Sequence, residues 1–309
     1  MLEHIPVLLG PSVDGVLHDP SGVYLDCTFG RGGHSRAILD RLSPVGRLVA
    51  LDRDPQAVLA MAHIQDSRFV GVRSAFADLD VALDSIGVDQ VDGVLMDIGV
   101  SSPQIDQAER GFSFRRNGPL DMRMDPQTGE SAADFLSRAS AREISEVIKN
   151  YGEERFAVQI AAAIVARRQE RSIATTLDLA QIVAGAVRTR EQGQDPATRT
   201  FQALRIHVNQ ELAQLEQGLA AAFRRLRVGG RLAVISFHSL EDRIAKQFIE
   251  RLANPKSQQD ARLRKMPLPE PKPVMKKLAR VKPCVAECER NPRARSSVLR
   301  VAEKLAEVA

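Results

Sequence analysis

The sequence predicts an α/β fold with a parallel sheet, because short apolar runs alternate with turn signals and helical stretches over the first hundred residues. Each run is apolar at consecutive positions, so we expect both faces of every strand to be covered. The expected strands are Val23–Cys27, Arg47–Leu51, Phe69–Val72 and Val91–Ile98.

Helices are expected between these strands, near Ser35–Leu42 and Pro55–Ile64. The second has a clear start signal, because Asp54 can cap exposed amides and Pro55 is tolerated at the first helical position.

The strand pattern stops after Ser102, where a loop rich in Gly, Pro, Arg and Met, Arg110–Gly129, leads into sequence with helical periodicity only. The expected helices are Ala132–Arg138, Ala141–Lys149, Glu153–Gln169 and Thr176–Val187. We therefore expect an all-helical insertion domain at residues 106–206, and a discontinuous core made of residues 1–105 and 207–309.

The α/β pattern then resumes. Its expected elements are a helix over Thr200–Leu226, a strand over Arg231–Ser236, a helix from Ser239 to Leu252 and a last strand over Ser297–Ala302. Ser239 stands three positions before Asp242, which resembles a capping box. Asn254–Pro273 is rich in Pro, Lys and Gln and predicts a basic linker.

The composition is that of an ordinary globular chain. Its 309 residues include 43 Lys and Arg against 39 Asp and Glu, a net charge of +4, which argues against a strongly polyanion-coating protein. Three cysteines form no disulfide framework, and no long apolar stretch is present, so we expect a cytoplasmic protein without a membrane span. Aromatic residues are only 4% of the chain, which limits base stacking as a binding mode.

The most informative segment is the turn from Asp26 to His34, where a strand ending in an acid is followed by glycines and a helix. Its pattern is G-x-G-G, with Gly30, Gly32 and Gly33, whereas a dinucleotide loop reads G-x-G-x-x-G. Asp26, four residues before Gly30, could attract the ammonium of a methionine moiety. The spacing favours S-adenosylmethionine, and a plain tight turn is the alternative.

Further acids stand at strand ends. Asp52, 22 positions after Gly30, can accept both ribose hydroxyls of an adenosine ligand, or cap a helix instead. Phe76 follows the third strand, where it could stack on adenine or join the core. Asp97 ends the fourth strand, at the edge where open α/β sheets bind ligands.

A polar loop with Ser101, Ser102 and Gln104 follows Asp97 and resembles a variant of the Asp/Ser-Pro-Pro-aromatic loop of amino-methyltransferases. An exocyclic amine is a poor nucleophile, so acceptors that hold its hydrogens would direct its nitrogen at the methyl group. An ordinary turn is the alternative interpretation. His238, after the fifth strand, could face the substrate base or bond a neighbouring backbone.

Arginines near these loops suit phosphate contacts, although such runs are often solvated surfaces. The candidates are Arg110, Arg115, Arg116, Arg123, Arg293 and Arg295.

Several ordered motifs resemble the MraW family of bacterial methyltransferases, which act on N4 of a cytidine in the decoding region of 16S ribosomal RNA. They include Thr28–Ser35, Gly99–Gln104, Glu109–Phe114, Pro196–Ala203 and Ser236–Arg243, in a match that spans nearly the whole chain. The resemblance implies a Rossmann-like class I S-adenosylmethionine methyltransferase sheet with an inserted helical domain that helps to recognise RNA, and 16S rRNA in the small ribosomal subunit as partner.

The resemblance also implies site residues. The implied S-adenosylmethionine contacts are Gly32, Gly33, His34, Asp52, Phe76, Asp97 and Gln104, to which the turn adds Asp26 and Gly30. The expected catalytic residues are Asp97, Ser101, Ser102 and His238. No metal site is expected, because Cys284 and Cys288 have no further cysteine or clustered histidine nearby.

Other functions stay open at this point. Pro283-Cys284 resembles the dipeptide of C5-cytosine methyltransferases, but it follows a linker near the C-terminus and not the fourth strand. An amino-methyltransferase acting on DNA or protein glutamine, a ribosome-assembly factor without turnover, and an NAD-linked oxidoreductase are the remaining alternatives.

Overall fold

The computed structural model describes residues 6–187, 195–255 and 271–307. The chain divides into two compact units, one made of Met1–Gly99 and Leu212–Ala309 and the other of Val100–Glu211. The predicted linker over Asn254–Pro273 lies mostly outside the described residues.

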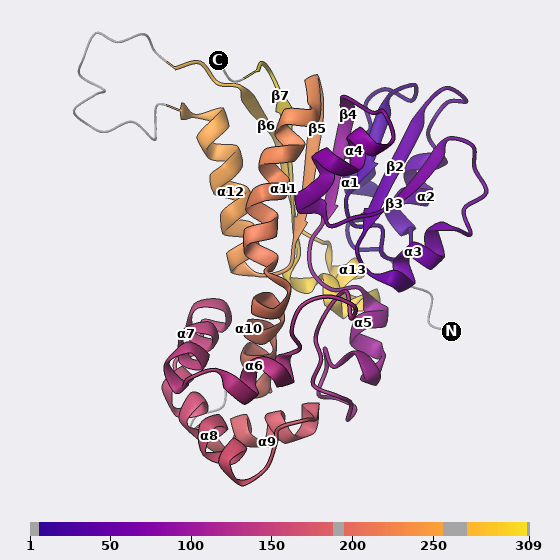
Figure 1. The fold of residues 1–309 in the computed structure, drawn as a ribbon. Helices are drawn as coiled ribbons and strands as arrows, with labels where there is room; N and C mark the ends of the chain where they lie inside the picture. The colour runs from indigo at the N-terminus through magenta and orange to yellow at the C-terminus, as the bar shows by residue number, and fades with distance from the viewer. Residues whose placement is uncertain (1–5, 188–194, 256–270, 308–309) are drawn as a thin grey trace, which may run out of the picture. The chain divides into compact units, whose positions relative to one another are not determined.

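The first unit is built on a seven-stranded sheet of order β3-β2-β1-β4-β5-β7-β6 (Figure 1). Its strands are β1 Val23–Asp26, β2 Arg47–Asp52, β3 Phe69–Arg73, β4 Val91–Asp97, β5 Leu226–Ser236, β6 Met275–Val281 and β7 Val298–Lys304. Strands β1 to β5 pair in parallel, whereas β7 runs antiparallel to both β5 and β6. The Rossmann-like α/β sheet is thus confirmed, and its order reverses between β1 and β4, where such sheets bind ligands.

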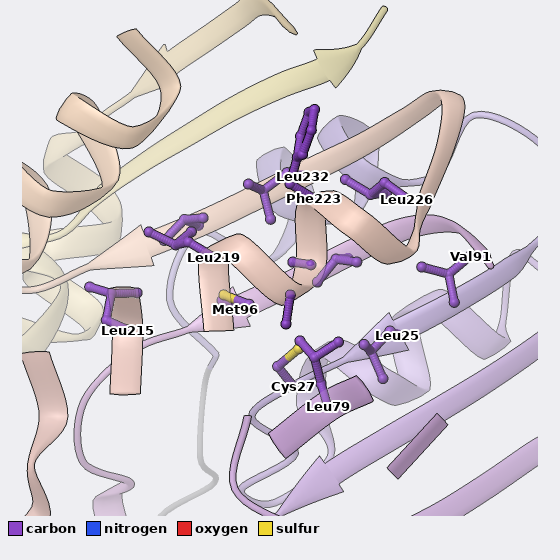
Figure 2. Close-up of a cluster of buried hydrophobic side chains, with 14 of the residues drawn as sticks. Leu25, Cys27, Leu79, Val91, Met96, Leu215, Leu219, Phe223, Leu226 and Leu232 are labelled. Carbon is purple, nitrogen blue, oxygen red and sulfur yellow. The ribbon is translucent and has the colours of Figure 1, made fainter. Parts of the chain in front are cut away.

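Helices cover both faces of this sheet, as the apolar strands predicted. They are α1 Leu9–Val16, α2 Gly33–Leu39, α3 Pro55–Met61, α4 Leu79–Ser85, α11 Glu211–Arg225 and α12 Ser239–Ala253. The unit also contains α13 Val285–Arg290, which has no buried residue. On one face Leu25 and Met96 pack with residues of α4 and α11 (Figure 2). Residues of α12 belong to the same core. On the other, Tyr24 and Leu95 pack with residues of α1 and α2. Side chains at neighbouring positions of a strand therefore pack into the cores on opposite faces of the sheet.

Helix starts follow local side-chain chemistry. Asp54 caps α3 by accepting the Gln56 N–H at 2.9 Å, with Pro55 in the first turn, as predicted. The cap of α12 lies one residue earlier than predicted, because His238 and Glu241 form the capping box, not Ser239 and Asp242.

The second unit is helical around one core. Its helices are α5 Ser102–Asp106, α6 Ala132–Arg138, α7 Ala141–Gly152, α8 Ala157–Glu170, α9 Thr176–Ala186 and α10 Ala197–Asn209. Reciprocal capping boxes start α6 at Ser131 and α7 at Ser140. Ile144, Ile160 and Leu204 are fully buried in the shared core, so the helices form one packed body.

Three element predictions were wrong. The single helix expected over Thr200–Leu226 is two helices, because Gln210 adopts a left-handed backbone conformation with φ 52°. Glu153 ends α7 in the same conformation and does not begin the next helix. Strand β6 was missed because its exposed positions carry basic side chains such as Lys276 and Arg280, which is typical of an edge strand.

Within the described residues, no helix combines the length and the apolar character needed to cross a membrane.

Candidate active site

The glycine-rich turn after β1 is held by Asp26. The Thr28 N–H donates to Asp26 Oδ1 at 3.0 Å, and the Ser35 hydroxyl donates to Oδ2 at 2.6 Å. The side chain is almost fully buried, and burial raises the pKa of the Asp26 carboxyl despite these bonds. Both oxygens are therefore used to join the turn to the start of α2, a positioning role that the sequence did not indicate.

The turn needs its glycines for two reasons. Gly32 has φ +75°, and a Cβ there would lie 2.6 Å from the Phe29 ring. At Gly33 a Cβ would lie 2.1 Å from Pro6 Cγ, so the chain approaches too closely for any side chain. The Gly30 N–H donates to Asp52 Oδ2 at 2.8 Å, which ties the turn to the end of β2.

Asp52 ends β2 and also accepts the Asp54 N–H through Oδ1 at 2.9 Å. Burial raises the pKa of the Asp52 carboxyl to about 6, against the lowering effect of the two backbone hydrogen bonds. Because a carboxylate offers about four acceptor positions, it retains the capacity to accept hydroxyl hydrogens.

Asp97 ends β4, two positions beyond Leu95, which pairs with Asp26 on β1. The Asp97 N–H donates to Thr28 Oγ1 at 2.7 Å, so its backbone is tied to the glycine-rich turn. Its side chain is 22% exposed, but Oδ1 is inaccessible and has no hydrogen-bond partner among the described residues. A buried, unpartnered carboxylate oxygen is costly and is a feature of sites that bind a ligand.

His34 lies beside Asp97. Its Nδ1 is 3.6 Å from Asp97 Oδ2, and its Nε2 is 3.1 Å from the Val7 carbonyl oxygen, which can only accept. The proton on Nε2 therefore points to Val7, and Nδ1 faces the carboxylate. Burial, then the charges of Asp26 and Glu241, raise the pKa of the Asp97 carboxyl well above its usual range.

His238 follows β5, as predicted, but its ring contacts Glu241, a residue that the sequence reasoning missed. The Glu241 N–H donates to His238 Nδ1 at 3.4 Å, and Nε2 lies 2.9 Å from Glu241 Oε1. Glu241 is fully buried. The sequence does carry a signal for Glu241, since it stands three residues after His238, the spacing of a capping box. The signal is visible only if histidine is accepted as the capping residue.

Phe76 begins a short 3₁₀ turn, Phe76–Asp78, after β3. Its ring is partly buried against the core, and a Cβ on Gly218 of α11 would lie 2.7 Å from it. The core contact predicted as the alternative is therefore present, and the exposed part of the ring is available for stacking.

The predicted polar loop belongs to the second unit, whereas Asp97 belongs to the first. The Ser101 N–H donates to Gln104 Oε1 at 2.9 Å, and the two residues form a capping box at α5, which begins at Ser102. Gln104 is buried. These residues thus stabilise the helical turn after Asp97 in addition to any ligand contact.

The candidate arginines fall into two groups. Arg110 is buried and donates to the carbonyl oxygens of Arg123 and Met124, at 3.1 and 2.8 Å, while Arg123 pairs with Asp121 at 2.7 Å. Both therefore hold the loop together. The exposed candidates are Arg115, Arg116, Arg293 and Arg295. Over the described ranges, no cluster of His, Cys, Asp and Glu could hold a metal ion.

Named relatives and a family model match nearly the whole chain. A ribosomal RNA small subunit methyltransferase H of Ralstonia pickettii (strain 12D) is 57% identical over 310 residues, covering 98% of this chain and 97% of the relative. The protein of the same name from Burkholderia thailandensis is 58% identical, covering 99% and 98%. A solved rRNA methylase from Streptococcus thermophilus aligns at 12% identity with a TM-score of 0.40, over 95% of this chain and 92% of that one. The model of the MraW methylase family matches residues 1–305, and the chain belongs to this family.

Proposed function

We propose that this methyltransferase transfers a methyl group from S-adenosylmethionine to the exocyclic N4 of a cytidine in the decoding region of 16S rRNA, within the small ribosomal subunit. Family membership and the names of relatives more than half identical support methylation of small-subunit rRNA. The motif resemblance supports the choice of cytidine N4.

The first unit offers a suitable place for the donor at the switch point between β1 and β4. Asp52 would accept the ribose hydroxyls, Phe76 would lie against the adenine, and the backbone of Gly30, Gly32 and Gly33 would allow close approach. Asp97, with His34 behind it, would attract the positively charged part of the donor. When bound, S-adenosylmethionine supplies a methyl group on a sulfonium, whose S–CH3 bond breaks as the N4–CH3 bond forms.

The residues of the chain have to position the acceptor, since the amine lone pair is delocalised into the base. Asp97 and the loop with Ser101 and Ser102 would hold the amino hydrogens, so that the nitrogen lone pair is directed at the methyl group. N4 cannot approach in line from within a stacked helix, so the base would have to be unpaired or flipped out. One proton leaves N4 after transfer.

The helical second unit would help to recognise the RNA, together with the exposed Arg115, Arg116, Arg293 and Arg295. Such guanidinium groups contact phosphates and position the substrate without reading its sequence. Gln104 would keep the turn after Asp97 in shape.

The observation that carries this proposal is the Asp97 carboxyl at the end of β4, whose buried Oδ1 has no hydrogen-bond partner in the part of the chain that the structure describes. The test is transfer of labelled methyl from S-adenosylmethionine to small subunits from a strain lacking this protein, followed by nucleoside mass analysis. We expect label at cytidine N4, and its loss with Asp97→Asn. Label in another nucleoside, or none in the RNA despite tight donor binding, would overturn the proposal.

A further inference from the structure

One peptide unit near the N-terminus lies between two side chains that are far apart in the sequence. The Leu8 N–H donates to Glu287 Oε1 at 2.6 Å, although the two residues are 279 positions apart. The carbonyl oxygen of the same unit belongs to Val7 and lies 3.1 Å from His34 Nε2. Since this oxygen can only accept, His34 donates to it. The peptide unit between Val7 and Leu8 therefore connects Glu287 on α13 with His34 on α2.

This peptide unit transmits direction because it is rigid. It is trans and planar, so its N–H and its carbonyl oxygen point in opposite directions. The bond to Glu287 on one side thus sets the direction of the bond to His34 on the other. Leu8 has a left-handed backbone conformation, with φ 51°, which a bulky residue keeps only where its surroundings hold it. The two hydrogen bonds and the buried side chains of Val7 and Leu8 hold it here.

The neighbouring sequence supplies no acceptor for the Leu8 N–H. Leu8 directly precedes α1, and in a capping box the side chain at the third helical position accepts this N–H. In α1 the third position is Pro11, whose side chain has no acceptor atom. Glu287 fills this role from near the other end of the chain.

The segment that follows α13 holds Glu287 in place. The Asn291 N–H donates to the Glu287 carbonyl oxygen at 2.7 Å. The next turn, Pro292–Ser296, buries Ala294 in the same core as Val7 and Leu8. Glu287 itself is only partly buried, so its replacement removes the hydrogen bond without opening a cavity in this core.

His34 links the peptide unit to the glycine-rich turn. Its ring is buried, and its Nδ1 lies 3.6 Å from Asp97 Oδ2. The preceding residue, Gly33, lies against Pro6, because a Cβ there would be 2.1 Å from Pro6 Cγ. The segment Pro6–Leu8 therefore packs on residues that are proposed to contact the donor.

We propose that Glu287 is a positioning residue of the candidate active site, which accepts the Leu8 N–H and so fixes the peptide unit that orients the His34 ring. This role needs an acceptor at position 287, whatever its charge. The link to donor binding rests on the proposed function. The link from Glu287 to His34 does not, and it can be measured in the full chain without donor.

The first measurement combines ¹⁵N NMR of the His34 ring with hydrogen exchange of the Leu8 amide. Glu287→Ala removes the acceptor, so the Leu8 amide should exchange roughly tenfold faster and the His34 Nε2 signal should shift. Glu289→Ala is the matched control, because Glu289 is exposed on the same helix, and it should leave both unchanged. A His34 signal in Glu287→Ala equal to that of the wild type would overturn the proposal, because Glu287 would then only cap α1.

Glu287→Gln tests whether the acceptor is what matters. It keeps an oxygen that can accept the Leu8 N–H, so the His34 signal and the Leu8 exchange rate should lie near the wild-type values. A change as large as that of Glu287→Ala would reject the proposal. If Glu287→Ala does not fold, Glu287→Asp takes its place, since it withdraws the acceptor by one methylene group. Unchanged His34 signals in folded Glu287→Asp would also reject the proposal.

The second measurement is the calorimetric affinity for S-adenosylmethionine, at a temperature where circular dichroism shows each variant to be folded. We expect the dissociation constant to rise about fivefold in Glu287→Ala, and Glu287→Gln to recover most of the affinity. Glu289→Ala should stay within about twofold of the wild type. Wild-type affinity in Glu287→Ala would disprove the link to the donor. If the wild type binds no donor, the proposed function fails, while the NMR measurement still decides the role of Glu287.

Discussion

Lys304 is a lysine with no exposed surface, and its replacement by methionine should be costly. Its Nζ donates to the carbonyl oxygens of Phe223 and Leu226 at 3.0 and 2.7 Å, and lies 4.8 Å from the centre of the Phe223 ring. These carbonyls lie at the C-terminal end of α11, where the helix itself supplies no donors. The ammonium thus caps a helix from inside the core.

The magnitude follows from what Lys304→Met removes. Two hydrogen bonds to a charged group are worth about 1.5 to 3 kcal/mol each, and both carbonyls would be left buried. Relief of the cost of burying an ammonium offsets part of this loss. The pair with Glu307, whose side chain is 61% exposed, adds little. We expect the free energy of unfolding to fall by about 3 kcal/mol.

Urea unfolding followed by circular dichroism would measure this loss. Lys276→Met is the matched control, because Lys276 is exposed on β6, and it should change the free energy of unfolding by less than about 0.5 kcal/mol. If Lys304→Met were as stable as this control, the two carbonyl contacts would not be the reason for the buried lysine.

Three further predictions concern the site and the helical unit. In Gly32→Ala the new residue must adopt φ +75° with its Cβ against the Phe29 ring. The variant should lose about 2 kcal/mol of stability, and its affinity for the donor, measured by calorimetry, should fall at least tenfold. An affinity equal to that of the wild type would contradict the argument that the backbone approaches the donor closely. The pKa of Asp52 is about 6 in the folded protein, against an ordinary value of 3.8. Its contribution to the free energy of unfolding is therefore fully present below pH 3.8 and is lost as the pH rises through 6. This loss is at most about 3 kcal/mol. The fall in unfolding free energy between pH 4 and pH 7 should therefore be smaller in Asp52→Asn, and equal falls in urea titrations would refute this. The Asn209 side chain donates to the Met122 carbonyl oxygen at 2.7 Å and accepts the Met124 N–H at 2.8 Å. Asn209→Ala should therefore lower the free energy of unfolding by about 2 kcal/mol. Asn209→Asp keeps only the acceptor, so its free energy of unfolding should lie between those of the wild type and Asn209→Ala.

The sheet could be predicted from the sequence because its strands are apolar on both faces, and the strand ends then placed Asp52 and Asp97 correctly. Residues near in sequence, such as Asp54 and Pro55, also signal their role directly. Such features depend on local patterns that tertiary structure does not override.

Other features depend on contacts that no local pattern reveals. Gln210 breaks a helix without glycine or proline, through a left-handed backbone that the fold imposes. Arg110 looks like a phosphate ligand, yet it bonds two carbonyls more than ten residues away. Glu241 was overlooked because histidine is an unusual cap, and because its burial arises only when α12 packs on the sheet.

The discontinuous first unit has a consequence for synthesis of the chain. Strands β1 to β4 come from residues before 100, whereas β5, β7 and β6 come from residues after 211. Strand β5 pairs with β4, so while the ribosome adds the intervening segment the nascent half-sheet keeps one side of β4 unpaired, and this edge is open to wrong partners. The helical segment has its own core and is complete before β5 emerges. Chaperone dependence and translation rate should therefore matter most during the addition of residues 100–226.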